Sequence, residues 1–200
     1  LSEDHRKLYE QIKKDYVAAI KGFDEDGNKL EGKAVIQHEV AVRIKLLQIL
    51  NGFITLTDDF GKKYRVTLPW NAKLDALDIK VKKVLEDPEK NIIIWCRFRW
   101  EIETIYKIYK EHSVFLYGGM TDAKREENLV KWKNDPTCRI MIAHPKTARY
   151  GFTWLKATET IFFSGTEDYE DFAQCRDRNY RRGQTREVTE TRIIAKNTIE

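Results

Sequence analysis

The sequence predicts an α/β protein whose second half forms a parallel β-sheet with helices on both faces. From Asn91 onward, short apolar runs alternate with segments that carry a helical pattern. The runs are continuous, as expected for strands that are covered on both faces. They start about 20–28 residues apart, which is the spacing of strand–crossover–strand units.

Each expected strand of this half is defined by its own apolar run. The runs cover residues 92–96, 114–117, 140–143, 161–163 and 188–195. Thr121 is expected to cap a helix that continues to Asn134, because its hydroxyl can accept a hydrogen bond from a free N–H of the first turn. A later helix is expected from Tyr169 to Tyr180, closed by Gly183.

The preceding part of the chain differs in character. Apolar residues at helical spacing mark two amphipathic helices, at residues 8–16 and 40–47. Residues 53–68 have the pattern of a β-hairpin with a polar, glycine-containing bend, and Asn71 can cap a further helix. We interpret residues 1–70 as a helical and β-hairpin extension packed on a lobe of residues 71–200, without a hydrophobic core of its own.

The composition excludes several classes of protein. A hydrophobic fraction of 42% and an aromatic fraction of 12% can build a sizeable core, which excludes wholesale disorder. No apolar run approaches the roughly 20 residues needed to cross a bilayer. The three cysteines and four histidines are too scattered for a disulfide framework or a metal site, and indicate a reducing, intracellular compartment. The chain begins with Leu1 and has no signal peptide, so we expect a fragment of a longer protein.

The segment from Gly22 to Lys29 has two glycines followed by a lysine, but its chemistry is wrong for a phosphate-binding loop. That loop needs Gly-Lys-Ser/Thr, whereas Asn28 breaks the motif and three acids would repel phosphate. A calcium loop would need a glycine at its sixth position and a glutamate at its twelfth, and both are absent. We interpret the segment as a solvated turn.

Positive charge is concentrated near the end of the chain. Residues 174–186 hold five arginines and one acid, so this segment carries the same +4 as the whole chain. On a helix that reaches Tyr180, Gln174, Arg178 and Arg181 would share one face. Such a face is either a solvated helix surface, in which Asp177 pairs with Arg181, or a pair of guanidinium groups placed to bind phosphate oxygens.

The identity of the residues in this segment is more informative about function than their spacing. QCRDRNYRRGQ, residues 174–184, resembles motif VI of the Swi/Snf-type family within the superfamily-two helicases, whose pattern is Gln-Ala-x-Asp-Arg-x-His-Arg-x-Gly-Gln. Cys175 and Tyr180 depart from it, where alanine and histidine are usual. The matching positions are Gln174, Asp177, Arg178, Arg181, Gly183 and Gln184.

Other segments are similar to motifs of this family in the expected order. Residues 91–98 resemble motif IV, and residues 118–121 with Arg125 are similar to a Gly-Ser-Thr…Arg stretch. Residues 146–154 resemble motif V, with Lys146 and Gly151 matching, Arg149 in place of a glycine and Thr153 where asparagine is common. Residues 197–200 resemble the Gly-Thr-Ile-Glu sequence that follows the last strand.

The resemblance implies a RecA-like second lobe of an ATP-dependent DNA helicase or translocase. In this family, Arg178 and Arg181 would be catalytic arginine fingers, and Gln174 and Gly151 would contact the nucleotide. ATP and Mg²⁺ would be bound mainly by a first, N-terminal lobe, which carries the P-loop. The chain alone would therefore be inactive, and that lobe would be its partner.

The resemblance also implies contacts to duplex DNA that are independent of base sequence. Lys146, Thr153 and Thr121 are the candidates for phosphate contacts. Arg97 is added because it lies at the carboxyl edge of the expected sheet, where ligands of parallel sheets bind. We expect a monomer. Two alternatives stay open: a nucleic-acid-binding module without hydrolysis, and the lobe of an RNA helicase.

Overall fold

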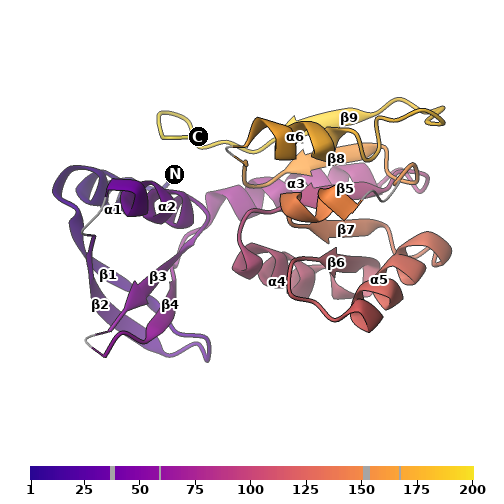
Figure 1. Ribbon diagram of the computed structural model, residues 1–200. Helices are drawn as coiled ribbons and strands as arrows, with labels where there is room; N and C mark the ends of the chain where they lie inside the picture. The colour runs from indigo at the N-terminus through magenta and orange to yellow at the C-terminus, as the bar shows by residue number, and fades with distance from the viewer. Residues whose placement is uncertain (37–38, 59, 151–153, 167) are drawn as a thin grey trace. The chain divides into compact units, whose positions relative to one another are not determined.

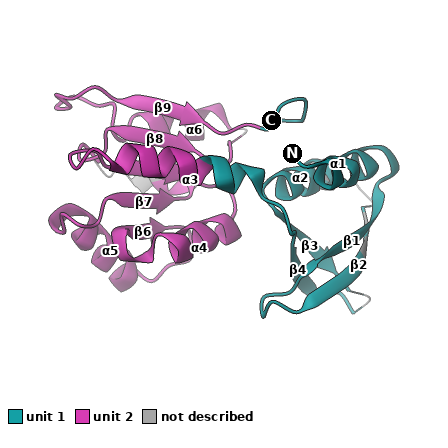
Figure 2. Ribbon diagram, turned by 180° about the vertical axis from the view of Figure 1, so that it is seen from behind, with its two compact units in different colours: residues 1–76, 195–200 teal, residues 77–194 magenta. Residues whose placement is uncertain are grey.

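The computed structural model describes the whole chain except residues 37–38, 59, 151–153 and 167. It divides into two compact units (Figure 2). Unit 1 comprises Leu1–Ala76 and Ala195–Glu200, and unit 2 comprises Leu77–Ile194. The chain therefore passes from one unit to the other twice. The predicted boundary after residue 70 concerns functional domains and stays a prediction.

Unit 2 contains the predicted parallel sheet, with strands in the order β6-β7-β5-β8-β9 (Figure 1). Every neighbouring pair runs parallel. The strands are β5 (Ile92–Trp95), β6 (Ser113–Leu116), β7 (Ile140–Ala143), β8 (Glu159–Phe162) and β9 (Thr189–Arg192). All four residues of β5, of β7 and of β8 are buried. Burial on both faces explains why the sequences of β5 and β7 are apolar throughout. The last strand is shorter than predicted.

Helices cover both faces of this sheet, as predicted: α6 lies in front of it in Figure 1, and α3 in front of it in the reverse view of Figure 2. The helices are α3 (Ala72–Leu85), α4 (Arg99–Ile108), α5 (Asp122–Asn134) and α6 (Tyr169–Arg176), with short 3₁₀ turns at Lys110–His112 (η1) and Pro145–Tyr150 (η2). Two predicted caps are confirmed. The Thr121 hydroxyl accepts a hydrogen bond from Lys124 N at 3.3 Å, and Asn71 Oδ1 accepts one from Leu74 N at 3.0 Å.

Unit 1 contains an antiparallel sheet in the order β2-β1-β4-β3. Its elements are α1 (Glu3–Asp15), β1 (Val17–Phe23), β2 (Lys29–Val35), α2 (Glu39–Leu50), β3 (Phe53–Thr57) and β4 (Lys63–Thr67). The predicted hairpin of residues 53–68 and both predicted helices are confirmed. The β1–β2 hairpin was not predicted, because its strands carry alanine, lysine and glycine where strong strand formers are usual. Only its turn, Asp24–Asn28, matches the solvated turn of the sequence analysis.

The prediction that the first part of the chain lacks its own core is wrong. Unit 1 has a hydrophobic cluster in which Leu8 and Ile12 of α1 pack with Ile20 of β1 and Ile49 of α2. The unpredicted hairpin supplies the missing surface, because alternate residues of β1 face inward. None of the helices in the described part of either unit is long and apolar enough to cross a membrane.

The last residues of the chain complete unit 1. The Tyr9 hydroxyl accepts a hydrogen bond from Ile199 N at 2.9 Å. Lys73 Nζ lies 2.5 Å from Glu200 Oε1, and both side chains are buried, with 3% and 7% exposed. Asn197, which stands where the family has glycine, has φ 59°, a conformation that asparagine tolerates better than most residues. The tail is therefore fixed by polar contacts within unit 1.

We predict that Lys73→Ala lowers the free energy of unfolding by about 3–5 kcal/mol, because it leaves the Glu200 carboxylate buried without its cation. Lys7→Ala is the matched control: Lys7 pairs with Glu3 at 2.7 Å, but both side chains are mostly exposed. Its loss should cost less than about 1 kcal/mol. Urea denaturation measures both. Equal effects of the two substitutions would contradict the buried pair.

Candidate functional site

The carboxyl ends of three neighbouring strands meet at one edge of the parallel sheet. Trp95 of β5 is paired with Ala143 of β7, and Ala143 with Leu116 of β6. The strands therefore end together, and the loops that follow them emerge at the same edge. These loops carry the predicted DNA contacts Arg97, Thr121 and Lys146.

The structure thus brings three of the four predicted nucleic-acid contacts to one edge. Lys146 and Thr121 are exposed, and Arg97 is half-buried. The Thr121 oxygen caps α5, but its hydroxyl proton stays available for donation. The fourth contact, Thr153, and the predicted nucleotide contact Gly151 lie outside the described residues.

A buried polar network that the sequence analysis missed fixes the turn at Arg97. Arg97 N donates a hydrogen bond to Ser164 Oγ at 2.7 Å. That hydroxyl donates to Glu101 Oε2 at 2.5 Å, and Phe98 N donates to the same carboxylate oxygen at 3.1 Å. Ser164 and Glu101 are 2% and 1% exposed. The available signal was the Phe98-to-Glu101 spacing, since a glutamate three residues after a helix cap often bonds back to the backbone.

Helix α6 begins at a strong cap and packs against η2. Asp168 Oδ1 accepts hydrogen bonds from Glu170 N at 2.9 Å and Asp171 N at 3.4 Å. Cys175 faces η2, with its sulfur 3.9 Å from Pro145 O, and burial raises the pKa of its thiol. Gln174, the predicted nucleotide contact, donates from Nε2 to Glu170 Oε1 at 2.9 Å. Its amide is therefore held along the helix surface.

The prediction that α6 continues to Tyr180 is wrong, since the helix ends at Arg176. Arg178 N donates to Cys175 O at 3.3 Å, which tightens the last turn. The Gln174 carbonyl instead accepts a hydrogen bond from Arg178 Nε at 3.1 Å. An arginine side chain thus occupies a carbonyl that a continuing helix would need. Gln174, Arg178 and Arg181 consequently do not form one helix face.

Gly183 does not close this helix either, because it lies seven residues beyond Arg176, where α6 ends. It has φ 101°, a conformation that strongly favours glycine, and it belongs to the turn that follows. Gln184 fixes that turn to the segment after motif V. Its Nε2 donates to Leu155 O at 3.0 Å, to Ala157 O at 3.3 Å and to Asn179 O at 3.3 Å.

Arg178 and Arg181 remain close enough to influence each other after the helix ends. Burial lowers the pKa of the Arg178 guanidinium, the nearby Arg181 charge lowers it further, and Asp177 opposes the change. The Arg178 carbonyl also accepts a hydrogen bond from Trp154 N at 2.9 Å. Two neighbouring cations, one of them part-buried and tied to the end of motif V, are suited to binding an anion.

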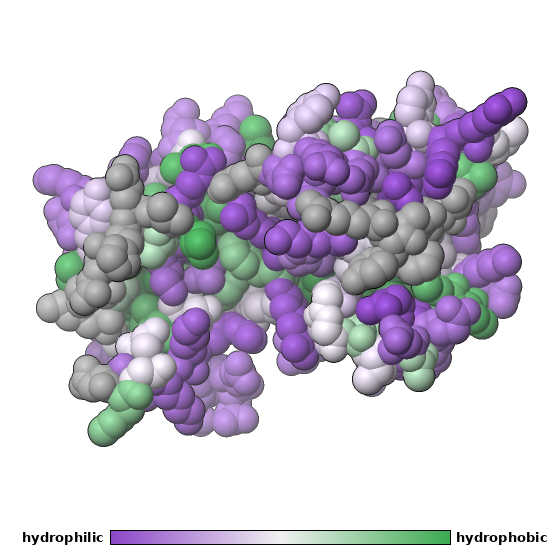
Figure 3. All heavy atoms as spheres, in the orientation of Figure 1, coloured by the Kyte–Doolittle hydropathy of each residue, from purple (hydrophilic) through white to green (hydrophobic). Residues whose placement is uncertain are grey.

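Other arginines of the cluster hold the scaffold together. Arg186 donates to the carbonyls of Glu89 at 3.1 Å and Lys156 at 2.8 Å. Arg176 pairs with Glu190 of β9 at 2.9 Å. These two side chains therefore make contacts that stabilise unit 2. The surface over α6 is hydrophilic on the face shown in Figure 3.

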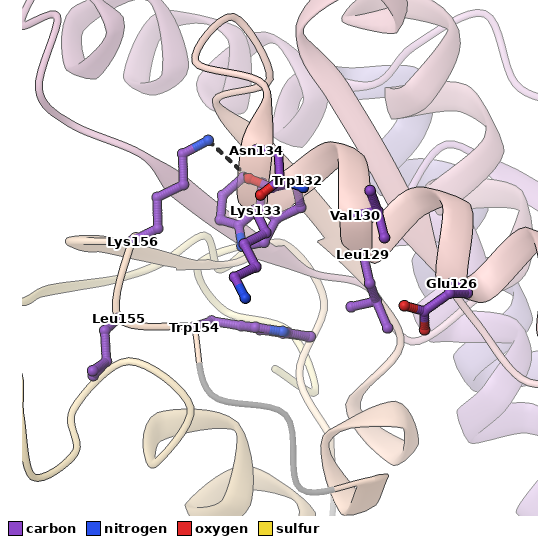
Figure 4. Close-up of a pocket in the computed structure, with 9 residues that line it drawn as sticks. All are labelled: Glu126, Leu129, Val130, Trp132, Lys133, Asn134, Trp154, Leu155 and Lys156. Atoms are coloured by element: carbon purple, nitrogen blue, oxygen red, sulfur yellow. Dashed lines mark hydrogen bonds between the residues drawn. The ribbon is translucent and has the colours of Figure 1, made fainter.

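In a pocket beside α5, backbone carbonyls hold the Lys156 ammonium group (Figure 4). Its Lys156 donates to the carbonyls of Trp132 at 2.9 Å, Asp135 at 3.0 Å and Cys138 at 2.8 Å. The ammonium group therefore satisfies carbonyls at the end of α5, and burial lowers its pKa. Trp154, which also lines the pocket, stacks on the buried Trp95 with ring centroids 5.4 Å apart. The two tryptophans of its lining therefore belong to the core packing beside α5.

Comparison with known proteins decides the family. The pattern of the family described as "Helicase conserved C-terminal domain" matches residues 72–183. The chain belongs to this family. The match covers α3 through the turn after α6 and includes the arginine pair.

Relatives of this helicase C-terminal domain are ATPases of the Swi/Snf type, as motif VI predicted. It is 26% identical over 133 residues to the "ATP-dependent helicase FUN30" of Saccharomyces cerevisiae. This alignment covers 65% of this chain and 12% of that protein. It is 28% identical over 130 residues to the "Chromatin-remodeling ATPase INO80" of Lodderomyces elongisporus, covering 64% and 8%. The chain thus spans a small part of the relatives it matches.

Solved structures share the fold of this helicase C-terminal domain. The crystal structure of the C-terminal part of the Fun30 ATPase domain matches with a TM-score of 0.59 and 26% identity, over 64% of this chain and 42% of that chain. The Sulfolobus solfataricus SWI2/SNF2 ATPase core in complex with dsDNA matches with a TM-score of 0.58 and 19% identity, over 96% and 36%. The predicted RecA-like α/β fold is confirmed.

Proposed function

We propose that this chain is the C-terminal motor lobe of an ATP-dependent DNA helicase or translocase. Arg178 and Arg181 act as arginine fingers on ATP that the N-terminal lobe of the same protein binds with Mg²⁺. The observation that carries the proposal is the arginine pair itself, held at the end of α6 next to the segment after motif V.

The chemistry of phosphoryl transfer explains why two arginines suit this role. Negative charge spreads over the phosphoryl oxygens in the transition state, and a guanidinium group binds such oxygens through its planar fork. Arg178 is oriented by its hydrogen bond to Gln174 O, so its position is fixed before the lobes meet. Gln174 and Gly151 stay proposed nucleotide contacts. Lobe closure would bring both arginines to ATP and would couple hydrolysis to movement.

We propose that a second group of side chains binds DNA phosphates. These are Lys146, Thr121, Arg97 and Thr153. Three of these belong to loops at one edge of the sheet, which supports a continuous contact surface. The dsDNA in the Sulfolobus solfataricus complex supports duplex DNA as the polymer. The proposal includes a monomer. It also includes an intracellular location, which similarity to chromatin-remodelling ATPases favours.

We predict that the 200-residue chain alone does not turn over ATP, because no Gly-Lys-Ser/Thr loop occurs in its sequence. The measurement is phosphate release by the purified chain, with and without duplex DNA. Turnover that stays constant through repeated purification would contradict the half-site proposal.

Arg178→Ala or Arg181→Ala in the full-length protein should each lower kcat by about 10³–10⁵, as loss of an arginine finger does in other phosphoryl-transfer enzymes. The nucleotide Kd should change far less, because the interaction is strongest in the transition state. Arg182→Ala is the matched control, since Arg182 is exposed and adjacent in sequence. Steady-state ATPase assays and nucleotide titrations measure both quantities. Normal turnover in the two single variants would assign these arginines to the solvated surface.

The chain alone should bind duplex DNA in the non-specific range, at a Kd of about 10⁻⁴–10⁻⁶ M. Affinity should fall steeply with salt and differ little between scrambled sequences, because the contacts are to phosphates. Lys146→Ala should make the log–log salt slope shallower by about one unit. Fluorescence anisotropy of labelled duplexes at several salt concentrations measures the slope. A strong preference for one base sequence would instead indicate a recognition module.

A further inference from the structure

His144 lies at the carboxyl end of β7, between the loops that carry two of the proposed DNA contacts. Its backbone continues the sheet pairing, since His144 N donates to Leu116 O at 2.9 Å. Its carbonyl accepts hydrogen bonds from Thr147 N at 2.8 Å and from Thr147 Oγ1 at 2.6 Å. Both the N–H and the carbonyl of His144 are therefore hydrogen-bonded, which fixes the backbone that carries the imidazole.

The His144 ring joins Lys146 to Arg97. Nδ1 accepts a hydrogen bond from Lys146 N at 3.1 Å. The ring also hydrogen-bonds to the backbone of Arg97. Because Nδ1 is the acceptor, the proton is on Nε2, the nitrogen that can donate to the Arg97 carbonyl. The opposite side of the same residue is held by Ser164 Oγ, 2.7 Å from Arg97 N.

This arrangement requires a neutral ring, and the surroundings favour one. Burial lowers the pKa of His144, and the charges of Lys146 and Arg97 lower it further. The hydrogen bond to the Arg97 backbone and the carboxylate of Asp171 on α6 act in the opposite direction. A protonated ring would lose its acceptor at Nδ1 and would release the Lys146 N–H.

We propose that His144 is a positioning residue, whose neutral imidazole holds the Arg97 turn and the Lys146 turn together so that both cations bind DNA phosphates as one unit. The inference rests on the proposed function, because Arg97 and Lys146 are the DNA contacts proposed there. It adds a residue that touches neither ATP nor DNA and that links the motif IV and motif V loops through their backbones.

The test compares salt slopes of duplex binding by the 200-residue chain. Lys146→Ala and Arg97→Ala should each make the slope shallower by about one unit, since each removes one phosphate contact. His144→Ala should make it shallower by more than either alone, because it releases both turns. His112→Ala is the matched control: His112 is exposed and precedes β6, at the amino edge of the sheet. It should leave the slope unchanged.

If His144→Ala does not fold, His144→Gln carries the same test. Its amide N–H can still reach the Arg97 carbonyl, so it should lose about one unit of slope through Lys146 alone. Ring-nitrogen NMR of the wild type gives a readout independent of DNA. It should show Nδ1 unprotonated, and the Lys146 amide signal should shift as His144 titrates.

The salt slope at acidic pH distinguishes a positioning role of His144 from direct phosphate binding by a protonated His144. When the pH falls from neutral to below the lowered pKa of His144, the wild type gains a proton on the ring. Opening of the two turns should then make the slope shallower, whereas a histidine that simply binds phosphate as a cation should make it steeper. The slope of His144→Ala should change little over this range.

The outcomes distinguish the two proposals. If Lys146→Ala and Arg97→Ala both leave the slope unchanged, the proposed DNA contacts are wrong, and the role of His144 is overturned with them. If those two variants lower the slope but His144→Ala does not, the contacts stand and the positioning role is overturned. A ring proton on Nδ1 in the wild type would also overturn it.

Discussion

The common termination of the parallel strands is the constraint on which the rest of unit 2 depends. β5 lies between β7 and β8, and Trp95 pairs with Ala143 on one side and with Phe162 on the other. Backbone hydrogen bonds thus set the depth at which all three following loops emerge. A shift of one residue in the β5–β8 pairing would move Ser164 away from Arg97.

Buried polar contacts then fix the conformation of the loops at this common edge. Ser164 fixes the Arg97 turn from the β8 side, Glu101 of α4 binds the Ser164 hydroxyl, and His144 fixes the turn from the β7 side. Polar groups that are buried and paired are costly to rearrange, because breaking one contact leaves the partner without water or a new bond. The loops are therefore expected to move with the sheet as a rigid edge.

The arginine-rich segment divides its charges between structure and function. Arg186 and Gln184 bind backbone carbonyls of the Leu155–Ala157 segment, which ties the end of motif VI to the segment after motif V. Arg178 and Arg181 lie within this braced turn. Burial and the neighbouring Arg181 charge both lower the pKa of Arg178, and the Asp177 carboxylate opposes them. The same segment thus supplies the contacts that hold the turn and the two arginines proposed to bind the nucleotide.

The sequence by itself determined the parallel α/β sheet, the Thr121 and Asn71 caps, the hairpin of residues 53–68 and the helicase family, because apolar periodicity, capping chemistry and short motifs are local properties. Tertiary structure decided the rest. Unit 1 has its own core because β1 and β2 pair despite weak strand propensity, and α6 ends early because the Arg178 side chain binds a helix carbonyl. The links from His144 and Ser164 to Arg97 join residues up to 67 positions apart, which only strand pairing brings together.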